Sequence, residues 1–152
     1  MRKLFCLAVI FISLISCNTN QSPEAVQAAI PIQGTWKLLT GTLIEKGDTT
    51  VTDYTKTSEF IKIINDTHFA FLSHDLNKDS VASFSAGGGN YTLKDSSYTE
   101  HLEYCNARQW EGNDFNFTVT IHNDTLTQKG IEKIDSLGVN RLNIEKYIRV
   151  KN

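Results

Sequence analysis

Apolar and polar residues alternate along most of the chain after residue 32. The clearest example is FNFTVTI, residues 115–121, in which every second residue is apolar. Successive side chains of a strand point to opposite faces, so this spacing predicts a strand with one buried face. An amphipathic helix would instead need apolar residues three and four positions apart. The pattern therefore predicts an all-β fold.

The same period of two predicts about eight or nine strands. Besides residues 115–121, they are residues 35–45, 60–64, 68–73, 81–85, 91–94, 98–104, 125–131 and 141–150. Turn sequences such as Asn123-Asp124 separate them. Short connections join antiparallel neighbours, so we expect an up-and-down antiparallel meander that closes into a β-barrel and leaves no exposed edge.

Two details of the strand pattern bear on the interior of the barrel. Gly87-Gly88-Gly89 lies in a strand-like stretch and predicts a bulge or a sharp bend. In the last strand, an apolar series alternates with a mainly polar one. The apolar series is Leu142, Ile144, Ile148 and Val150, and the other is Arg141, Asn143, Tyr147 and Arg149.

Residues 1–16 have the pattern of a lipoprotein signal peptide. A basic start precedes an apolar run, residues 4–15, which is shorter than the roughly 20 residues of a membrane span. Leu14-Ile15-Ser16-Cys17 resembles a bacterial lipobox, which implies cleavage after residue 16 and diacylation of the Cys17 sulfur. The alternatives are an ordinary secretory signal and an uncut anchor. Residues 17–31 are then expected to form a tether, and residues 32–152 are expected to form the barrel domain.

These features predict a lipid-anchored protein of the bacterial cell envelope, whose acyl chains lie in the membrane. No acidic run follows Cys17, and in Bacteroidetes such a run resembles a surface-export signal. The periplasmic face of the outer membrane is therefore favoured. The formal net charge of −2 gives no reason to expect a nucleic-acid partner. After processing, Cys105 would be the remaining free thiol, expected as a small buried hydrophobe.

Several stretches together resemble the lipocalin-like lipoproteins of unknown function found in Bacteroidetes. They are Gly34-Thr35-Trp36, residues 62–71 (KIINDTHFAF), residues 87–104 (GGGNYTLKDSSYTEHLEY) and residues 145–150 (EKYIRV). The resemblance covers residues 32–152 and implies that Trp36 plugs a closed barrel end beneath a basic side chain of the last strand. Arg149 is the matching candidate for that side chain. One departure is Tyr147, near which such chains often have Trp.

Glu100 is the main candidate for a functional side chain. Alternation places Tyr98, Leu102 and Tyr104 on the inward face of their strand, and Glu100 belongs to the same series. A carboxylate inside a barrel is costly unless it is paired or solvated. Glu100 is therefore expected to have a partner or to lie in a wet cavity.

Three interpretations of an inward Glu100 stay open. It forms a structural pair with a tyrosine or with a core lysine such as Lys62 or Lys146, it orients a ligand in a wet cavity, or it acts as a general acid or base with a raised pKa. Trp110, in the loop of residues 105–114, either caps the barrel mouth over a ligand or packs on the rim.

The outward face of the same strand offers a weak metal pattern. His101, Glu103 and Cys105 are spaced two residues apart and are expected to stand in a row. No CxxC or HxxxH pattern accompanies them in the sequence, and we predict neither a metal nor another cofactor.

The sequence contains no nucleophile elbow, phosphate loop or metalloprotease helix, and we predict no catalytic residues. The favoured function is binding of a small, partly apolar ligand inside the barrel of a membrane-anchored protein. The candidate ligand-binding residues are Glu100, Tyr98, Tyr104 and Trp110. The alternative is a structural or envelope-interaction lipoprotein with a packed barrel. A third hypothesis is an enzyme that uses Glu100, although the sequence shows no partner group for it.

Overall fold

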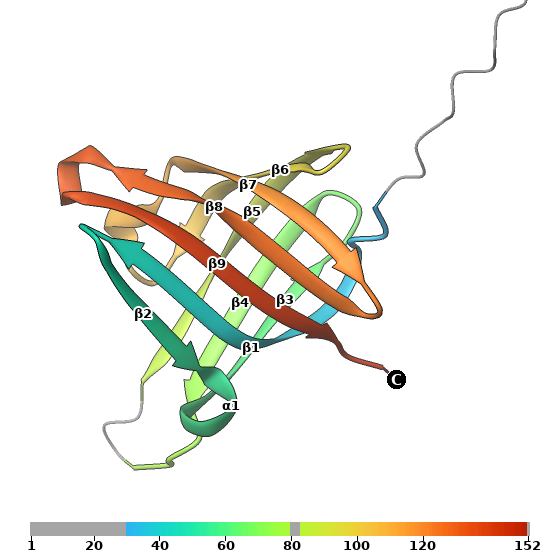
Figure 1. The fold of residues 1–152 in the computed structure, drawn as a ribbon, viewed down its shortest axis with the longest axis horizontal. Coiled ribbons are helices and arrows are strands. Elements are labelled where there is room, and N and C mark those ends of the chain that lie inside the picture. Colours follow the sequence, from blue (N-terminus) through green and yellow to red (C-terminus); the bar gives the residue numbers. More distant parts are fainter. Residues whose placement is uncertain (1–29, 80–82, 152) are drawn as a thin grey trace, which may run out of the picture.

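A computed structural model describes residues 30–79 and 83–151 of the protein (Figure 1). The predicted signal peptide and Cys17 lie outside these residues. The described part contains nine strands, one helical turn, α1 (Tyr54–Thr57), and two 3₁₀ turns, Arg108–Trp110 and Asp135–Leu137. The strands are β1 (Gly34–Glu45), β2 (Asp48–Asp53), β3 (Ser58–Ile64), β4 (His68–Asp75), β5 (Phe84–Lys94), β6 (Ser97–Cys105), β7 (Asn113–His122), β8 (Thr125–Ile134) and β9 (Val139–Arg149).

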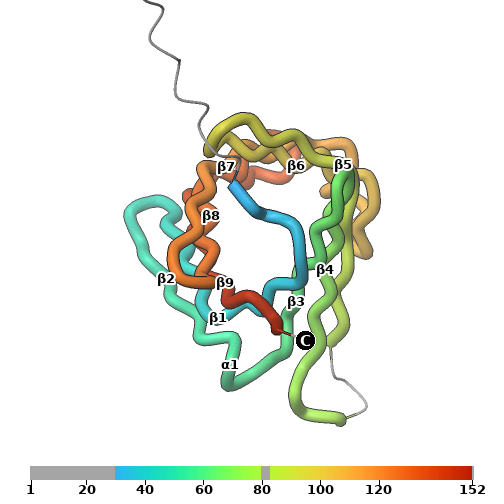
Figure 2. Tube along the Cα trace, turned by 90° about the vertical axis from the view of Figure 1, so that its right-hand side faces the viewer, coloured from blue at the N-terminus to red at the C-terminus, as the bar shows by residue number. Residues whose placement is uncertain are grey.

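Eight of these strands close an antiparallel up-and-down barrel, which confirms the predicted fold class (Figure 2). The sheet runs from β1 through β3 to β9, and β9 pairs again with β1. The first part of β1 pairs with β3, whereas residues from Thr40 onward pair with β2. The sequence pattern did not predict β2, and it divided β5 into two strands. β2 extends one end of β1 and lies outside the closed ring.

Local turn chemistry explains how the strands follow one another. The β7–β8 connection consists of Asn123 and Asp124, which both have positive φ, 46° and 61°. A two-residue hairpin loop with two positive φ values matches the twist of the strands, and Asn and Asp tolerate this backbone region well. The predicted Asn123-Asp124 turn is therefore confirmed. No helix in the described residues is long and apolar enough to cross a membrane.

Trp36 and Arg149 close one end of the barrel. The Trp36 side chain is 0% exposed, and the Arg149 guanidinium carbon lies 4.0 Å from its ring centroid. Arg149 also donates hydrogen bonds of 2.6 Å to the carbonyl oxygens of Pro31 and Gln33. The chain before β1 crosses this end of the barrel, as Figure 2 shows in blue. The contact implied by the family resemblance is therefore present, with the segment before β1 held beneath Arg149.

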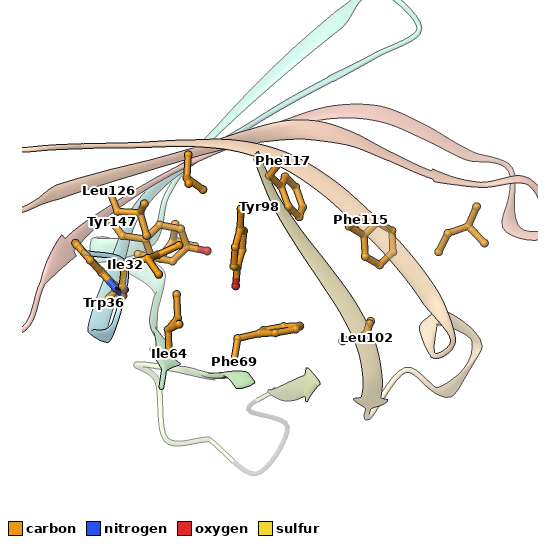
Figure 3. Close-up of a cluster of buried hydrophobic side chains, with 13 residues drawn as sticks. Ile32, Trp36, Ile64, Phe69, Tyr98, Leu102, Phe115, Phe117, Leu126 and Tyr147 are labelled. Carbon is orange, nitrogen blue, oxygen red and sulfur yellow. Dashed lines mark hydrogen bonds between the residues drawn. The ribbon is translucent and has the colours of Figure 1, made fainter. Parts of the chain in front are cut away.

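The buried core extends along the barrel from the end that Trp36 closes. Ile32, Leu126 and Tyr147 lie around Trp36, while Leu102 and Phe115 lie toward the other end (Figure 3). All thirteen side chains of this core are at most 6% exposed.

The last strand, β9, presents to the barrel interior the face opposite to the one that its apolar pattern predicts. Tyr147 and Asn143 are buried, whereas Ile148 and Val150 are partly or fully exposed. Tyr147 and Arg149 are two residues apart, so the placement of Arg149 over Trp36 brings the whole mainly polar series to the inner face. The inner face of β9 therefore carries the mainly polar series, with Arg149 over Trp36 at one end of it.

A bulge between β5 and β6 corrects two further expectations. Gly88 pairs with Tyr104 but Gly89 pairs with Leu102, so Glu103 is an extra residue in β6. A side chain on Gly89 would overlap the His101 carbonyl oxygen, which explains the need for glycine there. The extra residue reverses the faces beyond Leu102. Tyr104, predicted to face inward, is 67% exposed, and Cys105, predicted to face outward, lines the barrel interior.

Candidate ligand-binding cavity

A cavity of about 240 Å³ occupies the half of the barrel away from Trp36. Phe115 and Leu102, two of its lining residues, lie at that end in Figure 3. The cavity has two kinds of wall. Side chains from β3, β4 and β7 and from the 3₁₀ turn after β6 form an aromatic wall, and β8 and β9 contribute a polar wall. The side chains of the aromatic wall are Phe60, Phe71, Trp110, Phe115 and Phe117, and those of the polar wall are Gln128, Glu132, Glu145 and the phenol Tyr147.

Lys62 and Glu100 form an ion pair across the inside of the barrel. Lys62 is 3% exposed and Glu100 is 7% exposed, and the Lys62 Nζ donates to Glu100 Oε1 at 2.6 Å. The same ammonium donates to Gln128 Oε1 at 3.1 Å. These side chains come from β3, β6 and β8, strands that do not pair with one another. All three also line the cavity. The pair therefore links distant strands and supplies the polar groups beside the packed core.

Burial and neighbouring charges set the ionisation of this pair. Burial raises the pKa of Glu100 above its ordinary value, although Lys62 acts in the opposite direction. Burial by itself would lower the pKa of Lys62, but the carboxylates of Glu100 and Glu145 raise it above its ordinary value. Lys62 is therefore positively charged at neutral pH and holds the only ammonium among the residues that line this cavity.

Two buried tyrosines lie next to the pair. The Tyr147 hydroxyl donates to Glu145 Oε2 at 2.7 Å, and burial followed by the charge of Glu145 raises the pKa of Tyr147 well above its ordinary value. The Tyr98 hydroxyl has no hydrogen-bond partner within the described chain. Burial, together with the charge of Glu100, raises the pKa of Tyr98 as well. Both phenols therefore stay neutral inside the barrel over the physiological pH range.

Trp110 lies at the mouth and lines the cavity. The centroid of the Trp110 ring is 5.9 Å from that of Phe115. The Arg141 guanidinium carbon lies over the face of the Trp110 ring, 5.3 Å from its centroid. Arg141 donates to Glu132 Oε2 at 2.6 Å, and Asn143 donates to Glu132 Oε1 at 2.7 Å. Trp110 thus packs on the rim, as one of the two interpretations predicts, and it also lines the cavity.

The four residues predicted to bind a ligand occupy three different environments. Glu100 and Trp110 line the cavity. Tyr98 is 0% exposed, belongs to the packed core and is not a lining residue. Tyr104 lies on the outer surface.

Glu145 is the most important lining residue that was not predicted from the sequence. It belongs to the same series as Tyr147 and Arg149 in the last strand. Arg149 was expected at the closed barrel end, and counting back in twos from it places Glu145 on the inner face. The signal was present in the sequence, but the apolar series of β9 pointed the other way.

The predicted row of His101, Glu103 and Cys105 does not form. The His101 Nδ1 lies 2.7 Å from Asp114 Oδ1, Glu103 contacts Asn90 on the outer face, and the bulge turns Cys105 inward. No group of three or more His, Cys, Asp or Glu side chains in residues 30–79 and 83–151 is arranged to hold a metal ion.

Comparison with known proteins identifies a family without assigning an activity. Among solved structures, the chain is similar to an uncharacterized protein from Bacteroides eggerthii DSM 20697. The similarity has 15% sequence identity and a TM-score of 0.46, and it covers 78% of this chain and 98% of that chain. No curated protein matches the sequence. Residues 31–152 match the family model described as "Domain of unknown function (DUF4488)". The chain therefore belongs to the DUF4488 family.

Proposed function

We propose that this protein binds a small, partly apolar molecule in the barrel cavity while Cys17 anchors it to a membrane of the bacterial cell envelope. The observation that carries the binding proposal is the cavity of about 240 Å³ with an aromatic wall facing a polar one. Ligand sites combine apolar walls with a few placed polar groups in this way.

The size of the cavity favours a small ligand over a packed structural barrel. A barrel of about eight strands either fills its interior with side chains or retains room for one small molecule. Here side chains fill the end near Trp36, and a cavity remains among the side chains toward the other end. Pockets for drug-sized ligands measure roughly 300–1,000 Å³, and benzene occupies an engineered cavity of roughly 150 Å³. The volume of this cavity lies between these two values, so it suits a ligand with a single aromatic ring or a short branched chain.

We expect 2-phenylethanol, used as a neutral probe, to bind in the cavity and to shift the NMR signals of its lining residues during a titration. Ala107→Phe places a ring at the mouth, where Ala107 lines the cavity, and should weaken this binding at least about tenfold.

The matched control is Ala70→Phe. Ala70 is exposed on β4, so the same ring would be added on the outer surface. This variant should bind the probe like the parent protein. An absence of binding to the parent, or equal weakening by both substitutions, would show that the cavity is not the binding site.

The anchoring proposal rests on the sequence, because Cys17 lies outside the described residues. Cys17→Ser removes the acylation site and should release the protein from the membrane fraction, since stable anchoring needs two acyl chains or an equivalent second signal. Cys6→Ser, a matched change within the predicted leader, should leave the protein in that fraction. Retention of the Cys17→Ser protein in membranes would contradict the anchor.

A further inference from the structure

The carboxylates that face the cavity outnumber the cations. Glu100 is paired with Lys62 at 2.6 Å, and Glu132 with Arg141 at 2.6 Å. Glu145 has a different environment. It accepts a hydrogen bond from the neutral Tyr147 hydroxyl, and no lysine or arginine of the described residues lies within salt-bridge distance of it. Two of the three cavity carboxylates are therefore paired with a cation, and Glu145 is not.

The register of the sheet explains why Glu145 has no cation within salt-bridge distance, although Lys62 lies near enough for the charge of Glu145 to raise its pKa. In β9, Glu145 is paired with Gly41 of β1 on one side and with Gln128 of β8 on the other. Gly41 has no side chain, and the Gln128 side chain accepts from Lys62. Lys146, the next residue in the chain, is exposed and points to the opposite face of the strand. The fold therefore leaves this carboxylate facing the cavity with one neutral donor.

The aromatic side chains near Glu145, like its carboxylate, favour a positively charged ligand. The rings of Phe60 and Phe71 stack at 5.7 Å, and Phe60 lies 6.3 Å from Tyr147, whose hydroxyl contacts Glu145. Phe60 and Phe71 also line the cavity. The faces of aromatic rings carry negative potential and attract cations. Lys62 and Arg141 already lie over Tyr147 and Trp110, whereas no lysine or arginine of the described chain lies over Phe60 or Phe71.

We infer that the cavity selects a small organic cation, an amine on an apolar body, and that Glu145 is its counter-ion. The ammonium group lies against Glu145, and the apolar body lies against Phe60 and Phe71. An anionic ligand is disfavoured because it would meet Glu145 and Glu132, while Lys62 is occupied by Glu100 and Gln128. This inference rests on the proposed binding function and specifies its ligand class.

Three probes of similar shape separate charge from size: 2-phenylethylamine, 2-phenylethanol and 3-phenylpropionate. NMR titrations of the purified protein at neutral pH should give a dissociation constant for the amine about tenfold or more below that of the alcohol. Hydrogen bonds to charged groups are stronger than those between neutral groups, which supports a difference of this size. The propionate should bind most weakly of the three.

Glu145→Gln tests the counter-ion directly. Glutamine retains an oxygen that can accept from Tyr147, so the local contact is kept while the charge is removed. Binding of the amine should weaken about tenfold, and binding of the alcohol should not change. Glu103→Gln is the matched control, because it removes the same charge from an exposed position on the outer face. It should leave the affinities for both probes as they are.

The results separate the two proposals. Equal affinities for amine and alcohol, preference for the propionate, or an amine affinity unchanged by Glu145→Gln would overturn the cationic ligand. The cavity function would still stand in those cases if the alcohol binds and Ala107→Phe blocks it. A lack of binding by all three probes would instead overturn the binding function, and the inference with it.

Discussion

Lys62→Met should destabilise the protein by about 3–5 kcal/mol, because it leaves the Glu100 carboxylate buried without its cation. The ammonium is also the group that joins β3 to β6 and β8 through its hydrogen bonds to Glu100 and Gln128. Methionine has a similar length and keeps the apolar contacts of the lysine stem. The loss therefore arises from the stranded charge rather than from a cavity, and urea denaturation monitored by circular dichroism measures it.

A second substitution distinguishes this cause from general disruption. Lys62→Met combined with Glu100→Leu removes both charges, and replacement of a buried ion pair by apolar residues is often neutral or stabilising. The double variant should therefore recover most of the stability lost in the single one. Lys146→Met, on the exposed face of β9, should change stability by no more than about 0.5 kcal/mol. If the double variant were as unstable as Lys62→Met, the stranded charge could not explain the loss.

Trp36→Ala should cost about 3–5 kcal/mol, the usual range for removing a large aromatic side chain from a core. Trp36 is fully buried, and its indole nitrogen donates to the Ile32 carbonyl oxygen at 2.7 Å. Its loss would also remove the surface on which the Arg149 guanidinium lies. Thermal and urea unfolding of the variant measure the effect.

Trp110→Ala provides the comparison, since Trp110 is a partly buried residue at the cavity mouth. We expect a smaller loss there because its ring packs against one side of the core and faces the cavity on the other. A Trp36→Ala variant no less stable than Trp110→Ala would show that the closed end does not depend on Trp36.

The fold was predictable from the sequence because its signals are local and repeated. Alternation in segments such as residues 115–121 predicts strands, and the short turns between them predict an antiparallel order that must close. The placement of Trp36 beneath Arg149 followed from the family resemblance. β2 was missed because DTTVTD has little apolar alternation and it packs outside the barrel ring.

The candidate site was predictable only in part because it depends on two non-local events. The position of an extra residue in a strand is set by pairing with the neighbouring strand, so the bulge at Glu103 and the reversal of Tyr104 and Cys105 could not be obtained by counting in twos. The choice of Lys62 as the partner of Glu100 depends on barrel closure, which brings together residues 38 positions apart. Glu100 itself was placed correctly because it precedes the bulge.

Ligand binding inside the barrel is tested most directly by a crystal structure determined after crystals of the protein have been soaked in 2-phenylethylamine. The ligand should occupy the cavity of about 240 Å³, with its ring against Phe60 and Phe71 and a polar end that reaches the β8–β9 wall. Lys62 and Glu100 should remain paired beneath it. A cavity closed by repacked side chains, or ligand found only on the outer surface of the barrel, would contradict a binding function for this interior.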